Sequence, residues 1–112
     1  MIIHEPITRL YLKEVAAERF GDMVKAVVDC RQNSMAIGGE LHADEEALLT
    51  AQGSKRESTW GINIYPAKSE EEWIEFDSMV NIKPAHGNRS RGVENTQIQE
   101  RIKEIVKKLV PK

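Results

Sequence analysis

The sequence predicts an α+β fold, in which three helices pack on a largely antiparallel sheet of about five strands. Apolar residues recur at helical spacing in three segments, and they alternate or run continuously in several others. Turn residues separate these segments in the order strand, helix, strand, strand, helix, strand, strand, helix. Strands joined by short turns favour antiparallel pairing, and the interspersed helices then cover the sheet. We expect residues 1–112 to form a single domain.

The first half of the chain supplies three of the strands and two of the helices. Residues 2–4 form a short edge strand, and residues 8–20 form a helix with an apolar stripe, which a glycine ends. Residues 23–30 are rich in valine on both faces, which is typical of a central strand that is covered on both sides. A polar turn leads to a strand at residues 35–38, and a second helix begins near Asp44, where acidic residues suit the helix dipole.

The second half begins with two segments of alternating apolar and polar residues. Residues 60–65 form a strand that a proline ends, and residues 73–83 carry the longest period-two pattern of the chain. The simplest arrangement pairs them as an antiparallel hairpin. The last helix, residues 96–109, has a continuous apolar stripe, and Thr96 and Gln99 form a capping box at its start.

Composition excludes several classes of protein. Of the 112 residues, 40% are hydrophobic and 30% are charged, and the net charge is −2, so no global field attracts nucleic acid or an anionic membrane. No apolar run is long enough to span a membrane, and no signal segment precedes the first strand, so we expect a cytoplasmic protein. The only cysteine, Cys30, excludes an intramolecular disulfide and a cysteine-only zinc site, and we expect an inert buried thiol.

The segment Ile37–Asp44 is the first candidate site. Gly38 and Gly39 let the backbone turn sharply between a strand and a helix, a place where folds often display groups that contact ligands. Three ionisable side chains follow, Glu40, His42 and Asp44. They are suitable as metal ligands or as acid and base groups, but their spacing is not diagnostic. The alternative is that Asp44 serves the helix dipole, Glu40 is solvated and His42 bonds a backbone group.

The second candidate is the basic, glycine-flanked loop of residues 87–92. Its glycines, Asn88 and a serine allow backbone amides to converge, and Arg89 offers a bidentate fork to phosphate or carboxylate. The loop lacks the spacing of a nucleotide-binding loop. The alternative is a solvated loop whose arginines pair with nearby glutamates.

Polar side chains of the two hairpin strands form the third candidate. Asparagine is depleted in strand interiors, yet it occurs at positions 63 and 81. We expect these residues to line a polar pocket together with Tyr65 and Glu75, on a face that also carries Trp73 and Met79. The alternative is a solvated sheet face with cross-strand pairs. Trp60 shares a face with two isoleucines and is expected in the core.

Several of these segments together resemble a family of short, uncharacterised bacterial and archaeal proteins, a domain of unknown function. The resemblance rests on residues 36–44, 53–54, 60–66, 74–76, 81–84 and 87–90, and so covers nearly the whole chain. It implies a single-domain, stand-alone protein and carries over no catalytic residue, cofactor or partner. One departure is Lys83, where the resemblance leads us to expect arginine, whose fork geometry lysine lacks.

The sequence therefore leaves three hypotheses for function. The first is a small soluble protein that binds an anionic ligand, bearing phosphate or carboxylate, between Arg89 and the Gly38–Gly39 turn, with Asn63, Tyr65 and Asn81 fixing the rest. The second is a hydrolase in which Glu40, His42 and Asp44 hold a metal or act as acid and base. The third is a protein-interaction module. Because no complete catalytic set is present, we rank binding first, assign no catalytic residue, and expect neither a cofactor nor a tightly bound metal.

Overall fold

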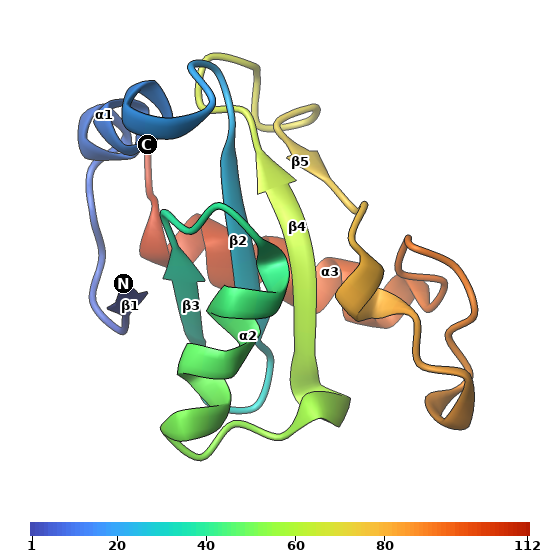
Figure 1. Cartoon of the computed structure of the whole chain (residues 1–112). Coiled ribbons are helices and arrows are strands. Elements are labelled where there is room, and N and C mark those ends of the chain that lie inside the picture. The colour runs from blue at the N-terminus through green and yellow to red at the C-terminus, as the bar shows by residue number, and fades with distance from the viewer.

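The centre of the molecule is an antiparallel sheet of five strands in the order β1-β3-β2-β4-β5 (Figure 1). The computed structural model describes all residues, 1–112. The strands are β1 (Ile2–Ile3), β2 (Val24–Asp29), β3 (Ser34–Ile37), β4 (Thr59–Ile64) and β5 (Ile74–Glu75). The valine-rich β2 is the central strand, as its two apolar faces predict, and pairs over its whole length with β4.

Three α-helices cover the two faces of this sheet. They are α1 (Arg9–Arg19), α2 (His42–Ala51) and α3 (Thr96–Leu109). In Figure 1, α2 lies in front of the sheet and α3 crosses behind it. The predicted α+β class, with three helices packed on a five-stranded antiparallel sheet, is confirmed. Three short 3-10 helices complete the fold: η1 (Arg56–Ser58), η2 (Met79–Asn81) and η3 (Pro84–His86).

The main hydrophobic core lies between the sheet and helices α1 and α3. It contains the alternate residues of β2 and β4 that face α3, including Trp60 as predicted, and the apolar stripes of both helices. A smaller cluster on the opposite face packs Leu49 of α2 on Val27 and Ala36. The face under α2 is therefore less apolar than the other, and most of the buried polar side chains lie on it or at its edges.

The predicted long strand at residues 73–83 is wrong. Only Ile74 and Glu75 pair with β4, and the chain then leaves the sheet to form η2. The chain leaves the sheet across Gly61 of β4, where it packs so closely that a β-carbon on Gly61 would lie 2.5 Å from the Ser78 hydroxyl. Trp73, expected on the polar face, is buried in the main core, where the Arg9 guanidinium stacks 4.2 Å from its ring centre.

The start of α3 also differs from the prediction. The N-cap is Asn95, whose side chain accepts hydrogen bonds from the backbone amides of Gln97 and Ile98. Thr96 is the first helical residue, and the Gln99 side chain donates to the carbonyl of Val93, so the expected capping box does not form. Asparagine is as good an N-cap as threonine, and here it comes one residue earlier.

Candidate functional site

The Gly38–Gly39 turn is held from both sides by charged side chains. Gly38 has a φ of +86°, which favours glycine, and its carbonyl accepts a hydrogen bond from Nε of Arg19 at 3.0 Å. The same guanidinium lies 2.9 Å from the Glu40 carboxylate. Glu40 is thus engaged by α1 at the surface and does not turn toward His42.

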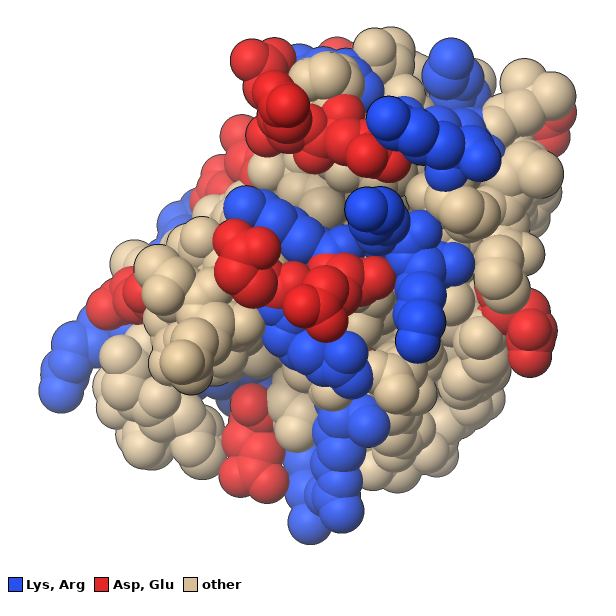
Figure 2. Space-filling model, turned by 180° about the vertical axis from the view of Figure 1, so that it is seen from behind, with Lys and Arg blue, Asp and Glu red and all other residues tan.

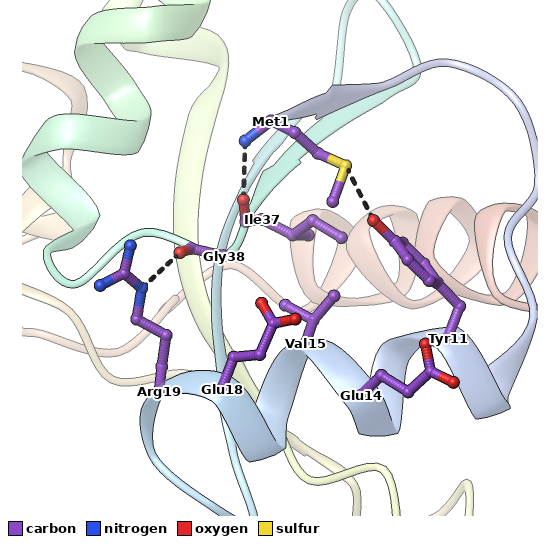
Figure 3. A pocket seen from close by; sticks show the side chains of 8 residues that line it. All are labelled: Met1, Tyr11, Glu14, Val15, Glu18, Arg19, Ile37 and Gly38. Atoms are coloured by element: carbon purple, nitrogen blue, oxygen red, sulfur yellow. Dashed lines mark hydrogen bonds between the residues drawn. The ribbon is translucent and has the colours of Figure 1, made fainter.

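Next to this turn is a hollow of about 390 Å³ between α1 and the end of β3 (Figure 3). Its lining carries the carboxylates of Glu14 and Glu18 and two cations, Arg19 and the amino-terminal ammonium of Met1. The charges balance, and both cations already donate to backbone carbonyls, those of Gly38 and Ile37. The anion site that the sequence suggested at the glycine turn lacks a free cation on this side.

Beneath the turn lies a buried acid that the sequence analysis did not single out. Glu45 of α2 is 1% exposed, and its Oε2 accepts a hydrogen bond from the amide of Gly39 at 3.0 Å, while its Oε1 has no partner. Burial raises the pKa of this carboxyl from 4.5 to about 8, against the opposing effect of the Gly39 amide. Gly39 is required here because a β-carbon would lie 2.8 Å from Cγ of Glu45.

His42 and Asp44 do not form a set with Glu40. The His42 Nε2 lies 2.8 Å from the carbonyl oxygen of Ile62, to which it must donate because a carbonyl only accepts. Burial lowers the pKa of this imidazole below 6.5, which keeps it neutral at neutral pH. Asp44 lies in the first turn of α2, where it faces the positive end of the helix dipole. Across the chain, no three His, Cys, Asp or Glu side chains are grouped so as to hold a metal ion.

Three of the predicted pocket residues do come together, at the β4–β5 edge. The Asn63 amide donates to the Glu75 carboxylate at 2.8 Å, and the Tyr65 hydroxyl donates to the same oxygen at 3.2 Å. Oδ1 of Asn63 is buried without a partner, on the face that α2 covers. This group is a bonded cross-strand network. Because it presents a shared carboxylate and no arginine, it does not favour an anion.

The side chain of Asn81 forms hydrogen bonds to the backbone of β4, which explains why asparagine occurs in a segment with a strand-like pattern. Its Oδ1 accepts from the amide of Gly61 at 2.7 Å and its Nδ2 donates to the carbonyl of Gly61 at 2.9 Å. The side-chain amide thus supplies the two hydrogen bonds that a neighbouring strand would give to β4. Asn88 then bonds the carbonyl of Asn81 at 2.7 Å and fixes the following loop.

The loop of residues 87–92 already holds an anionic group of the protein, the carboxylate of Glu94. The backbone amides of Arg89 and Ser90 donate to one oxygen of Glu94, at 2.7 and 2.9 Å. These hydrogen bonds lower the pKa of Glu94. The predicted convergence of amides is therefore present and already engaged. The loop of residues 87–92 lies beyond the β4 side of the sheet, whereas the Gly38–Gly39 turn joins β3 to α2, and β2 and β4 separate the two in the sheet order (Figure 1).

Lys83 is almost completely buried and its ammonium group is held by the protein. Its Nζ donates to the carbonyl of Thr59 and lies 4.1 Å from the centre of the Trp60 ring. Burial lowers the pKa of this amine from 10.5 to about 8. Lys83, at the position where arginine was expected, is therefore a buried structural cation in contact with the Trp60 ring.

Trp60 also lines a shallow, open cleft of about 330 Å³, which we name the Arg31–Arg101 cleft. Its two arginines come from the turn between β2 and β3 and from α3. Arg101 donates to the carbonyl of Cys30 at 3.4 Å and to the side chain of Asn33. The remaining lining residues are mostly polar and come from η1 and the start of α3: Glu57, Ser58, Asn95, Gln97 and Ile98, beside Cys30 and Trp60.

Cys30 lies in this cleft as a protonated thiol. It is half-buried, and burial raises its pKa from 9.0 to about 11, against the opposing charge of Arg101. The inert thiol expected from the sequence agrees with this pKa. Because the thiolate is the nucleophile, the cleft has the chemistry of a binding site and not that of a cysteine nucleophile.

Sequence reasoning missed this cleft because its parts are far apart in the chain. Arg31 reads as part of a turn, and Arg101 lies outside the apolar stripe of α3, so neither position stands out locally. They meet only when α3 packs on the sheet, which brings together residues 71 positions apart.

Comparison with known proteins places the chain in a family without giving it an activity. No curated protein and no solved structure matches it. None of its helices combines the length and apolar character needed to cross a bilayer. Residues 1–109 match the model of a family described as a protein of unknown function (DUF5674), as the resemblance implied, and the chain therefore belongs to that family.

Proposed function

We propose that the protein binds a small anionic ligand, bearing phosphate or carboxylate, in the Arg31–Arg101 cleft. The observation that carries the proposal is that two arginines, one from the turn between β2 and β3 and one from α3, line the same cleft. Arg31 enters the hydrogen-bond network only through its backbone amide, so its side chain has no acceptor in the protein. Arginine presents a planar fork of donors, which matches the geometry of phosphate and carboxylate oxygens.

The surroundings of the two arginines support the same ligand class. Ser58, Asn95 and Gln97 add neutral polar side chains, and Glu57 is the only acid in the lining. Two buried charges flank the cleft: the ammonium of Lys83 lies against the Trp60 ring, and the carboxylate of Asp29 accepts from the Arg31 amide. These two charges offset each other, so the attraction for an anion comes from the two arginines of the lining.

Thermal unfolding with added phosphate tests this proposal. Phosphate at ten times its dissociation constant stabilises the folded state by about 1.4 kcal/mol, which raises the melting temperature of a domain of this size by roughly 5 °C. We expect wild type to show this rise and Arg31→Gln to lose most of it. Citrate at the same ionic strength serves as the carboxylate probe.

Two single-charge variants serve as controls. Lys13→Gln removes a positive charge from α1, outside the cleft, and should keep the response of wild type. Arg89→Gln tests the loop that the sequence favoured, and it should also keep the response because that loop already holds Glu94. Equal stabilisation of wild type and Arg31→Gln overturns the assignment to the cleft. Loss of the response in Arg89→Gln alone moves the site to the loop, and no response in any protein overturns anion binding.

A further inference from the structure

We infer that the ligand is an extended polyanion, a linear chain of phosphate groups, which continues from the Arg31–Arg101 cleft along one flank of α3. The inference rests on the proposed function, because it adds a second contact region to the same binding site. Its basis is the arrangement of neighbouring hollows and of basic side chains without partners on this flank.

Three hollows follow one another along α3 and share lining residues. The Arg31–Arg101 cleft shares Arg101 with a hollow of about 510 Å³, which Lys107, Lys108 and Pro111 also line. That hollow in turn shares Lys108 with one of about 280 Å³ between the end of α3 and the segment that carries His4. Because each pair has a lining residue in common, the three hollows lie in a row along α3, and we call this row the groove.

Basic side chains outnumber acidic ones in this groove. Arg31, Arg101, Lys107 and Lys108 line it, whereas its carboxylates are those of Glu57 and Glu104. Figure 2 views the molecule from the α3 side and shows Lys and Arg side chains across much of this face, with acidic side chains set among them.

The lysines of the groove are available to a ligand. The ion pairs of α3 join Arg101 to Glu104 and Lys103 to Glu100, and neither Lys107 nor Lys108 is part of one. Both lysines lie in the last turn of α3, where they also compensate the helix dipole. Compensation of the helix dipole explains why the last turn of α3 carries lysines, but it does not explain the two hollows that Lys108 lines.

The spacing of the cations indicates the length of the ligand. Arg101 and Lys108 are seven residues apart on α3, close to two turns, which separates them by roughly 10 Å along the helix axis. A single phosphate reaches only one of them, whereas a flexible chain of phosphates reaches both. Once one end is held by the arginines, the rest of the chain meets Lys108 at a high effective concentration.

The groove does not suit single-stranded nucleic acid. Proteins that bind single strands stack the bases on exposed aromatic rings. Among phenylalanine, tyrosine and tryptophan, only Trp60 lines this groove, and it is 3% exposed. A polyanion without bases satisfies the charges and needs no stacking surface.

Calorimetric titration with phosphate, tripolyphosphate and a longer linear polyphosphate tests the inference. We expect affinity to rise with chain length, by about tenfold or more from phosphate to the longest chain. Arg31→Gln should weaken every probe. Lys108→Gln should weaken the longest chain several-fold and leave inorganic phosphate unchanged. Lys13→Gln loses one positive charge as Lys108→Gln does, and it should bind every probe as wild type does.

The outcomes separate the inference from the proposed function. In one outcome, phosphate binds and Arg31→Gln weakens it, but Lys108→Gln and Lys13→Gln bind the long chain equally well. The groove then contains no second contact region, so the inference falls while the proposed function stands. If no probe binds, both fall. A single-stranded oligonucleotide that binds more tightly than polyphosphate of equal charge overturns the ligand class.

Discussion

Replacing Glu45 with glutamine should make the protein more stable at pH 8 and change it little at pH 5. The folded state raises the pKa of this carboxyl from 4.5 to about 8, mainly through burial. The folded protein therefore keeps a proton that the unfolded chain releases near pH 4.5. The contribution of Glu45 to stability is complete below pH 4.5, and it is lost progressively as the pH rises toward 8. Glutamine has the same shape and no charge to release.

The size of the stability difference follows from the difference between the unfolded and folded pKa values of Glu45, 4.5 and about 8. Each unit of pKa difference corresponds to about 1.36 kcal/mol, so the full interval is worth at most roughly 5 kcal/mol. That is a large part of the free energy of unfolding of a domain, about 5–15 kcal/mol. At pH 5 the two proteins should agree within about 1 kcal/mol, because the amide can still accept from Gly39 and the position of the unpartnered Oε1 stays unsatisfied in both.

The assay is urea unfolding of both proteins at pH 5, 6, 7, 8 and 9. His42 and Lys83 also have shifted pKa values, but both are present in each protein, so the difference between the two curves isolates Glu45. We predict that this difference widens from pH 5 to pH 8 in favour of Glu45→Gln and then stays constant. Parallel curves would mean that Glu45 ionises normally and would refute the assignment of a buried, protonated acid.

Three further predictions concern the β4 edge and the cleft. Gly61→Ala should destabilise the fold by about 2–3 kcal/mol in urea unfolding, because its β-carbon meets Ser78, whereas Gly92→Ala meets only ordinary contacts and should cost less than about 1 kcal/mol. Asn81→Ala should cost about 2–4 kcal/mol and speed hydrogen exchange at the Gly61 amide, since it leaves two buried backbone groups unpaired. The Cys30 thiol should react with a disulfide reagent at pH 8 roughly 100-fold more slowly in the folded than in the unfolded protein, because its pKa is raised by burial to about 11; equal rates would contradict that pKa.

The fold was predictable wherever local periodicity and packing agree. The valine-rich β2 and the amphipathic α3 carry patterns that can be satisfied only by a covered strand and a half-buried helix. The failure at residues 73–83 has a physical cause. A period-two pattern shows that alternate side chains point in opposite directions, but it does not say what occupies the edge of the neighbouring strand. At Gly61 that edge is taken by the side chain of Asn81.

The candidate site was less predictable, because local chemistry does not show which groups are already engaged. The sequence identified real features: a glycine turn, converging amides at residues 87–92, and unusual asparagines. In the folded chain, Arg19 and Glu45 hold the turn, and Glu94 occupies the amides. Arg31, whose side chain has no acceptor in the protein, meets Arg101 only through tertiary packing, which a single sequence does not reveal.

An NMR titration of the isotopically labelled protein with phosphate tests the central claim most directly, because it locates the ligand without any substitution. We predict that the amide signals of Arg31, Gln97 and Ile98, around the Arg31–Arg101 cleft, shift in a saturable way at fixed ionic strength. The amides of Gly39 and Arg89 should stay in place, since neither residue lines the cleft: Gly39 lies in the turn between β3 and α2, and Arg89 lies in the loop of residues 87–92. Saturable shifts at Gly39 or Arg89 with none around the cleft, or no saturable shift at all, would contradict the account.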